Sequence, residues 1–123
     1  MPARRPQEIY ELFKQFFDAK DTDALVALYE PNAAFQSQPG QVVTGHAAIR
    51  EALGGFLALN AEFQMQPAAI IETANLALLI SKWTLKGTDP NGEPVDLSGQ
   101  TSDVVRRQSD GTWLFVIDNP YGM

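Results

Sequence analysis

The chain has 123 residues, of which 45% are hydrophobic and 10% aromatic, and this is enough apolar material for one compact core. We therefore expect one domain spanning residues 1–123. Fifteen acidic and nine basic residues leave a formal net charge of −6, which repels a phosphate backbone and makes nucleic acid an unexpected partner. The absence of cysteine and the single histidine exclude disulfides, thiolate nucleophiles and multi-histidine metal centres, so we expect neither a metal nor a cofactor.

The first residues do not resemble a targeting segment, because Arg4 and Arg5 precede an amphipathic stretch and no continuous apolar run with a cleavage site follows. The longest strongly apolar run, residues 76–80, is far shorter than the ~20 residues that cross a bilayer. The sequence thus predicts a soluble, cytoplasmic protein without a membrane partner.

Two helices are expected first. Pro6 fits a first helical turn, and one apolar face continues to about Ala19 with helical spacing: Ile9, Leu12, Phe13, Phe16 and Phe17. Asp21 can cap a second, shorter helix that includes Tyr29 on its buried side and ends at Pro31.

Strands dominate the remainder. Residues 33–37 and 41–44 read as two short strands around a Pro-Gly turn, and a third helix runs from Gly45 to about Leu57. An alternating pattern begins at Glu62, and a second long strand over 76–86 places five residues on one face: Ala77, Leu79, Ser81, Trp83 and Leu85. A loop at 89–92 leads to one long strand over about 95–108, and a turn at 109–111 leads into the last strand, 113–118.

Helices followed by an antiparallel meander predict an α+β fold in which the helices pack on one face of a curved sheet. The last strand is apolar on both faces, so its outer face requires a cover. A homodimer through the outer sheet face is the simplest cover, and a C-terminal tail folded back over it is the alternative.

Three segments resemble the NTF2-like superfamily, most nearly its SnoaL-like and ketosteroid-isomerase-like members: residues 21–29 (DTDALVALY), 45–50 (GHAAIR) and 110–113 (DGTW). The resemblance implies a cone-shaped fold in which three N-terminal helices pack on a curved, mixed but mostly antiparallel sheet and enclose an apolar pocket. It also implies a dimer. It does not fix the function, because isomerases, cyclases, epoxide hydrolases, dehydratases and non-catalytic binding modules share this fold.

The steroid-isomerase pattern within this superfamily implies a phenol at Phe13, a base at Ser37 and an acid at Asp103. Phe13 cannot donate a hydrogen bond, and Ser37 without a partner base cannot abstract a proton from carbon. Tyr10 could supply the phenol only if the helix were displaced. We therefore do not expect steroid isomerisation by the usual base-plus-phenol mechanism.

Asp103 is the first catalytic candidate on independent grounds. Alternation from Val95 and Leu97 carries one sheet face to Asp103, so an acid interrupts an inward apolar row. A buried carboxyl needs a raised pKa or a partner, which makes it a candidate general acid or hydrogen-bond donor. The alternatives are neighbouring hydroxyls that satisfy it, or a bulge at Gly99 that turns it to solvent.

Asp118 is the second catalytic candidate. The turn at 109–111 places either Asp118 or Ile117 opposite Asp103. In the first case two carboxyl groups share one pocket and form an acid/base pair; in the second case Asp118 points outward and ends the strand. The following Asn119 either orients a ligand or closes the tail.

Aromatic residues line small-molecule pockets as readily as they fill cores. The candidates for ligand binding are Phe13, Phe17, Tyr29, Phe35, Phe56, Phe63 and Trp83, together with Asn119. Core packing is the default for most of them, and Tyr29 and Trp83 are favoured because their polar atoms need partners. His46, at a helix start, reads as a surface residue.

The leading hypothesis is a protein that binds an apolar small molecule and uses Asp103 as acid or donor in an isomerase, cyclase, hydratase or hydrolase type of step. The alternative is a non-catalytic ligand-binding or protein-interaction module.

Overall fold

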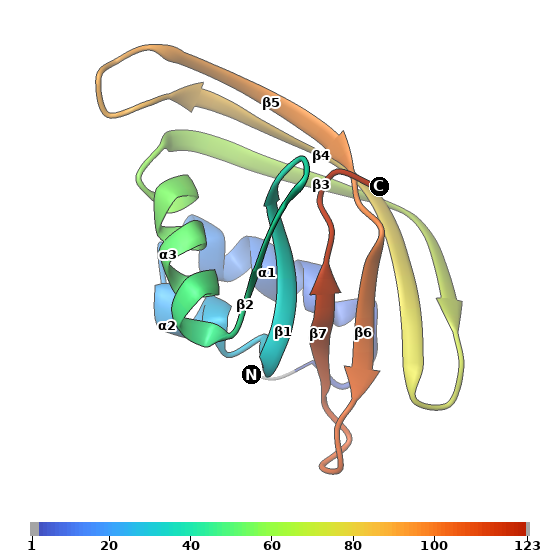
Figure 1. The fold of residues 1–123 in the computed structure, drawn as a ribbon. Coiled ribbons are helices and arrows are strands. Elements are labelled where there is room, and N and C mark those ends of the chain that lie inside the picture. The colour runs from blue at the N-terminus through green and yellow to red at the C-terminus, as the bar shows by residue number, and fades with distance from the viewer. Residues whose placement is uncertain (1–2, 123) are drawn as a thin grey trace.

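A computed structural model describes residues 3–122 of the chain. Its elements are, in order, α1 (Glu8–Asp18), α2 (Thr22–Val26), β1 (Tyr29–Gln38), β2 (Gln41–Thr44), α3 (His46–Leu57), β3 (Asn60–Glu72), β4 (Leu76–Thr88), β5 (Pro94–Gln100), β6 (Asp103–Arg107) and β7 (Trp113–Asp118). The helices lie against the concave face of a curved, unclosed sheet (Figure 1). The expected α+β class is therefore confirmed.

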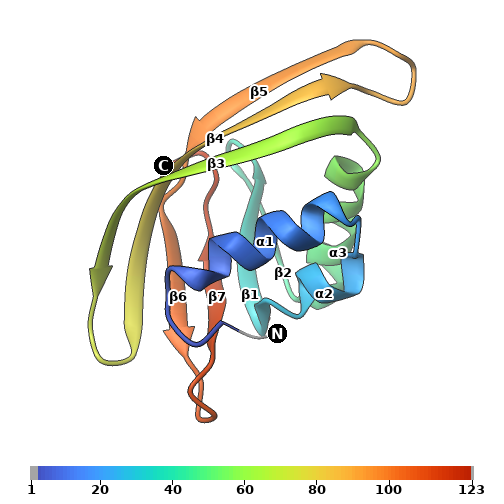
Figure 2. The same ribbon diagram turned by 180° about the vertical axis from the view of Figure 1, so that it is seen from behind.

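The sheet has the order β2-β1-β7-β6-β4-β3, and β5 pairs with β4 beyond the end of β6. Within residues 3–122, β1 and β7 pair in parallel and the other pairs are antiparallel, which confirms a mixed, mostly antiparallel sheet. Helix α1 crosses the concave face, with α2 and α3 beside it (Figure 2).

The second helix is shorter than expected. Asp21 caps α2 by accepting a 3.1 Å hydrogen bond from the backbone N–H of Ala24, as predicted. The helix ends at Val26, however, and Tyr29 is the first residue of β1, where it pairs with Phe115 of β7. The expected helix end at Pro31 is also wrong, because Pro31 lies in β1. Proline is tolerated there because the pairing of β1 with β7 is interrupted between Tyr29 and Ala34, so no backbone N–H is needed at Pro31.

The single strand expected over residues 95–108 is two strands. β5 pairs with the second half of β4 and β6 with the first half. Between them the backbone N–H of Thr101 donates to the Ser81 carbonyl (2.8 Å), and that of Ser102 donates to the Asn119 carbonyl (2.9 Å). The register with β4 is the same on both sides of this break, since Lys82 pairs with Gln100 and Leu79 with Asp103. Beyond the break, β6 also pairs with β7.

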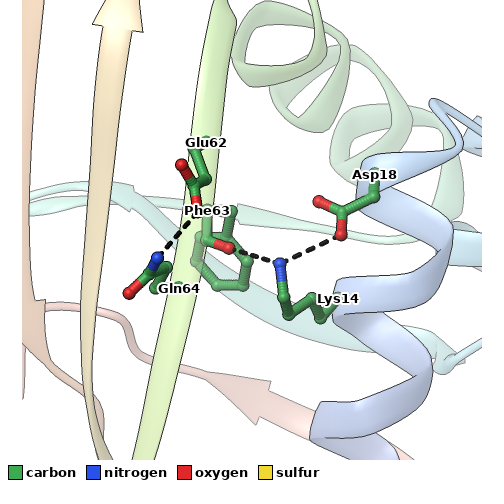
Figure 3. A network of polar contacts seen from close by, with 5 residues as sticks. All are labelled: Lys14, Asp18, Glu62, Phe63 and Gln64. Atoms are coloured by element: carbon green, nitrogen blue, oxygen red, sulfur yellow. Dashed lines mark hydrogen bonds and ion pairs between the residues drawn. The ribbon is translucent and has the colours of Figure 1, made fainter.

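Lys14 fastens α1 to β3 (Figure 3). Its Nζ donates to the carbonyl oxygen of Phe63 at 2.7 Å and lies 3.0 Å from Oδ2 of Asp18. The flanking Glu62 and Gln64 bond to each other through their side chains. The bond to the Phe63 carbonyl holds that part of β3 against α1. The ring of Phe63 also packs on the ring of Phe17, with 5.1 Å between the ring centroids.

A row of aliphatic residues crosses the outer face of the sheet. The strand registers place Ile71 beside Leu78, Leu78 beside Val104, and Val104 beside Ile117. Ile71 is 62% exposed and Ile117 44% exposed. Residues 119–122 do not cover this row, since Pro120 and Tyr121 line a cavity on the concave side. We define the four side chains Ile71, Leu78, Val104 and Ile117 as the outer row.

None of the helices in the described part of the chain has the length and apolar character that crossing a bilayer requires.

Candidate functional site

A cavity of about 60 Å³ lies between the helices and the concave face of the sheet. Its wall is almost entirely apolar, and more than half of its residues are aromatic. They are Tyr10, Phe13, Phe17, Phe35, Leu53, Phe56, Phe63, Met65, Trp83, Leu85, Thr101, Asp103, Phe115, Asp118, Pro120 and Tyr121. The acidic groups of this wall are Asp103 and Asp118, and no basic residue is among its members.

Asp103 is the first residue of β6 and faces inward, which confirms its expected orientation; it is 1% exposed. The Tyr10 hydroxyl donates to its Oδ2 at 2.6 Å, and the backbone N–H of Asn119 donates to its Oδ1 at 2.7 Å. Helix α1, strand β6 and the chain after β7 therefore meet at one carboxyl group.

Asp118 lies beside Asp103, so of the two registers that the sequence left open, this one is correct. Val105 pairs with Phe115 and Val104 with Ile117, which leaves Val116 as an extra residue in β7. After this bulge Phe115 and Asp118 both face inward, while Ile117 faces outward. The two carboxyl groups are hydrogen-bonded to each other, and the Tyr29 hydroxyl donates to Oδ2 of Asp118 at 2.5 Å.

Burial raises the pKa of both carboxyl groups, most strongly that of Asp103, where the nearby charge of Asp118 adds to the effect. The hydrogen bonds from Tyr29 and from Asp103 oppose the rise in the pKa of Asp118. The two carboxyl groups therefore titrate as a pair, and the pKa of Asp103 is raised more strongly than that of Asp118. Two titratable carboxyl groups thus lie side by side against a cavity whose wall is almost entirely apolar.

The phenol at this site comes from Tyr10, whose hydroxyl reaches Asp103 from the first half of α1. Tyr10, Phe13 and Phe17 share one face of α1, and the helix crosses the sheet so that its first turn reaches β6 while Phe13 and Phe17 pack near Phe63 of β3. Burial, together with the charge of Asp103, raises the pKa of Tyr10 well above its usual value, so the phenol remains protonated.

The polar network continues from Tyr10 into the sheet. Oγ1 of Thr101 lies 3.0 Å from the Tyr10 hydroxyl and 3.0 Å from Oγ of Ser81. Sequence reasoning did not single out Thr101 or Ser81 as members of the site. The available signal was a hydroxyl at position 81 in the inward row of β4 and another at position 101, two residues before Asp103 on the same face.

The aromatic candidates fall into two groups. Those that line the cavity are Phe13, Phe17, Phe35, Phe56, Phe63 and Trp83. Tyr29 lies behind Asp118 and contributes through its hydroxyl. Asn119 lies at the edge of the site. Its backbone N–H donates to Asp103, and its Oδ1 accepts a 2.6 Å hydrogen bond from the side chain of Gln36.

Two further residues that the sequence raised have other surroundings. Ser37, in the position of the isomerase base, lies on the hairpin side of β1, with its Oγ 3.5 Å from the Gln41 carbonyl oxygen. A ring nitrogen of His46 lies 2.8 Å from the carbonyl oxygen of Tyr29, which ties the start of α3 to β1.

The chain after β7 closes one side of the cavity. Nε1 of Trp83 donates to the Pro120 carbonyl at 2.6 Å, and the Tyr121 hydroxyl donates to the Ser37 carbonyl at 3.2 Å. Gly99 makes this approach possible: a Cβ there would lie 2.8 Å from the Pro120 carbonyl oxygen and 2.9 Å from Nε1 of Trp83.

Helices on the concave face of a curved, mixed sheet, with an aromatic cavity between them, define an α+β protein with an enclosed site. Residues 9–116 match the model of the SnoaL-like domain, and the chain belongs to this family. No curated protein sequence matches it.

Solved structures agree on the fold. A ketosteroid isomerase-like protein from Erwinia carotovora atroseptica superposes with a TM-score of 0.80 at 17% identity, covering 91% of this chain and 88% of that one. A candidate dehydratase of the NTF2-like family from Streptomyces avermitilis gives 0.80 at 13% identity, with coverages of 95% and 93%. A candidate calcium/calmodulin-dependent protein kinase type II association domain from Thiobacillus denitrificans gives 0.78 at 18% identity, with coverages of 100% and 97%. At these identities the likeness shows the fold alone.

Proposed function

We propose that the protein binds a compact, neutral, mainly apolar molecule in the aromatic cavity and transfers a proton to or from it with the Asp103–Asp118 pair. The observation that carries this proposal is a buried pair of carboxyl groups, hydrogen-bonded to each other, on the wall of an apolar cavity. Isomerase, cyclase, hydratase and hydrolase types of step all require such a transfer.

The roles follow from the protonation of the pair. In this proposal Asp103 holds the proton, releases its hydrogen bond to Asp118 when the ligand binds, and donates to a ligand oxygen on which negative charge develops. Asp118, which carries the charge, accepts a proton from the ligand. Since the pair carries a net negative charge and no basic residue lines the cavity, an anionic ligand is disfavoured.

Steroid isomerisation by the usual base-plus-phenol mechanism remains unsupported, because Ser37 occupies the position of the base. The hydroxyl of Tyr10 is engaged with Asp103, so in this protein the phenol positions the acid.

Exchange of the methyl protons of acetophenone into D₂O, followed by proton NMR, tests the transfer without knowledge of the natural substrate. We expect exchange above the buffer rate, reduced by about 10²-fold or more in Asp103→Asn and in Asp118→Asn, the scale of general acid–base catalysis. Asp110→Asn is the control, because Asp110 is an exposed acid in the β6–β7 turn. Equal exchange in the wild type and Asp103→Asn would reject the catalytic role.

A non-catalytic ligand-binding module is the second candidate. It is favoured by the satisfaction of the pair: within residues 3–122 every buried side-chain nitrogen or oxygen has a hydrogen-bond partner. Binding of acetophenone by calorimetry with no exchange above the buffer rate would select this candidate.

We further propose that a second copy of this chain covers the outer row. The support is its continuity across four strands, β3, β4, β6 and β7, together with the exposure of Ile71 and Ile117. A contiguous aliphatic strip of this kind marks an association surface more often than a free one.

A further inference from the structure

A second hollow adjoins the cavity. It is a groove of about 560 Å³ between α3 and the β1–β2 hairpin. Its walls are half polar and are formed by Ser37, Gln38, Gln41, Val43, Ala48, Glu51, Ala52, Gly55, Phe56 and Leu59. Phe56 is the residue that these walls share with the cavity.

Phe56 is positioned as a partition between the two spaces. It is half-buried in the last turn of α3, and its ring lies 6.5 Å from that of Phe35, centroid to centroid. The preceding residues diverge, since Leu53 lines the cavity and Ala52 the groove. Gly54 and Gly55 provide no side chain on this part of α3, and Phe56 is the wall residue that both hollows have in common.

The two hollows differ greatly in volume. A cavity of about 60 Å³ is far below the ~300–1,000 Å³ of typical ligand pockets, whereas the groove is within that range. A molecule that enters the aromatic cavity and extends toward the hairpin meets Phe56.

We propose that Phe56 sets the upper length of the ligand, restricting the site to compact one-ring molecules. This inference rests on the proposed ligand-binding function and names the size class of that ligand. Truncation of Phe56 joins the cavity to the groove, so that an alkyl chain attached to a bound ring gains a path between Val43 and Leu59.

The test is calorimetric titration with a neutral series of fixed head and growing tail, the phenyl alkyl ketones from acetophenone to octanophenone. We expect wild-type affinity to fall beyond a short tail, and Phe56→Ala to bind octanophenone at least tenfold more tightly than the wild type does. Phe56→Trp should reduce the longest alkyl tail that the site accepts. Phe16→Ala is the matched control, because Phe16 is another half-buried aromatic residue and lines neither the cavity nor the groove.

The outcomes separate the inference from the function on which it rests. Binding of acetophenone with the same tail limit in wild type, Phe56→Ala and Phe56→Trp overturns the partition and leaves the binding function standing. An equal shift in Phe16→Ala also overturns it. Binding of octanophenone by Phe56→Ala alone, with no ketone bound by the wild type, supports the partition and overturns the wild-type binding function. No binding by any variant overturns both. Near-ultraviolet circular dichroism establishes that each variant is folded, and Phe56→Trp supplies the test if Phe56→Ala does not fold.

Discussion

Asp118 lies beside Asp103 because β7 contains one residue more than β6 between the pairs Val105–Phe115 and Val104–Ile117. The bulge moves Ile117 to the outer face and returns Asp118 to the inner face, where its carboxyl group meets that of Asp103. One local irregularity thus places a carboxyl group in the cavity and an aliphatic side chain in the outer row.

The stability of the protein should depend on pH through Asp103. Its folded pKa is raised by burial and by Asp118, so between its unfolded and folded pKa values the folded state holds more protons, and stability falls as pH rises through that window. Asp103→Asn removes this dependence. We expect its stability relative to the wild type to increase by up to about 1.4 kcal/mol per pH unit there. Urea unfolding from pH 4 to pH 9 measures this difference.

Asp110 should change the stability of the protein with pH in the direction opposite to Asp103. Hydrogen bonds from the side chain and backbone of Thr112 lower its pKa, so its contribution to stability is present above the unfolded pKa and is lost as pH falls through the folded one. Asp110→Asn should therefore weaken the protein at neutral pH relative to acid. Parallel pH profiles for Asp103→Asn and Asp110→Asn would contradict the assignment.

The two phenols should tune the two carboxyl groups separately. The bond from Tyr10 lowers the pKa of Asp103, and that from Tyr29 lowers the pKa of Asp118. Tyr10→Phe should therefore raise the first pKa and Tyr29→Phe the second, each with a loss of about 1–3 kcal/mol in stability from a buried acceptor that loses its donor. Carbon-13 NMR of the carboxyl groups follows the titrations.

These two substitutions should not be additive, because the affected carboxyl groups titrate as a pair. A double-mutant cycle should give a coupling of about 0.5–3 kcal/mol. Tyr121→Phe is the control, since its hydroxyl bonds to the Ser37 carbonyl. Strict additivity of Tyr10→Phe and Tyr29→Phe would show that the carboxyl groups act independently.

Two glycine substitutions should have opposite effects. Gly99→Ala forces its Cβ against the Pro120 carbonyl and the Trp83 indole, so we expect a loss of about 1–3 kcal/mol and a changed tryptophan emission as that hydrogen bond breaks. Gly55→Ala adds a Cβ with no atom within 4 Å, and should stabilise α3 by up to about 1 kcal/mol. Chemical unfolding followed by fluorescence measures both, and equal stability of the two variants would contradict the close approach at Gly99.

The proposed dimer should dissociate on one charge substitution in the outer row. Ile117→Asp places a carboxylate where two copies would bury an aliphatic surface, so sedimentation equilibrium should show a monomer with an unchanged circular dichroism spectrum. Leu97→Asp is the control: Leu97 is 41% exposed, but it lies on β5 outside the row. A wild-type protein that is monomeric at high concentration would reject the dimer.

The α+β class, the inward face of β4 and the turns at 89–92 and 109–111 were predictable because they depend on local periodicity and turn chemistry. Helix length at Tyr29 and the division of β5 from β6 were not, since both result from pairing with a distant strand. Tyr29 pairs with Phe115, and the backbone N–H of Ser102 bonds to Asn119. At Tyr29 and between β5 and β6, contacts in the folded sheet override the local preference of the sequence.

The same distinction applies to the site. Alternation alone identified Asp103 as an inward acid, but two registers were open for Asp118, because a bulge has no reliable local signature. Tyr10 was discounted because the position of a helix along a sheet is set by packing and not by its own sequence. The crossing of α1 over the concave face decides that Tyr10, and not Phe13, reaches Asp103.

The bond between Tyr10 and Asp103 joins residues 93 positions apart. Contacts of such long sequence separation form late in folding, since the entropy of closing the intervening chain must first be offset by other interactions. Without α1 on the sheet, Asp103 lacks its hydrogen bond from Tyr10 and is open to water, so we expect it to ionise more readily at neutral pH. Assembly of the site is therefore coupled to the uptake of a proton, and the final docking of α1 should proceed faster in mild acid than in alkali.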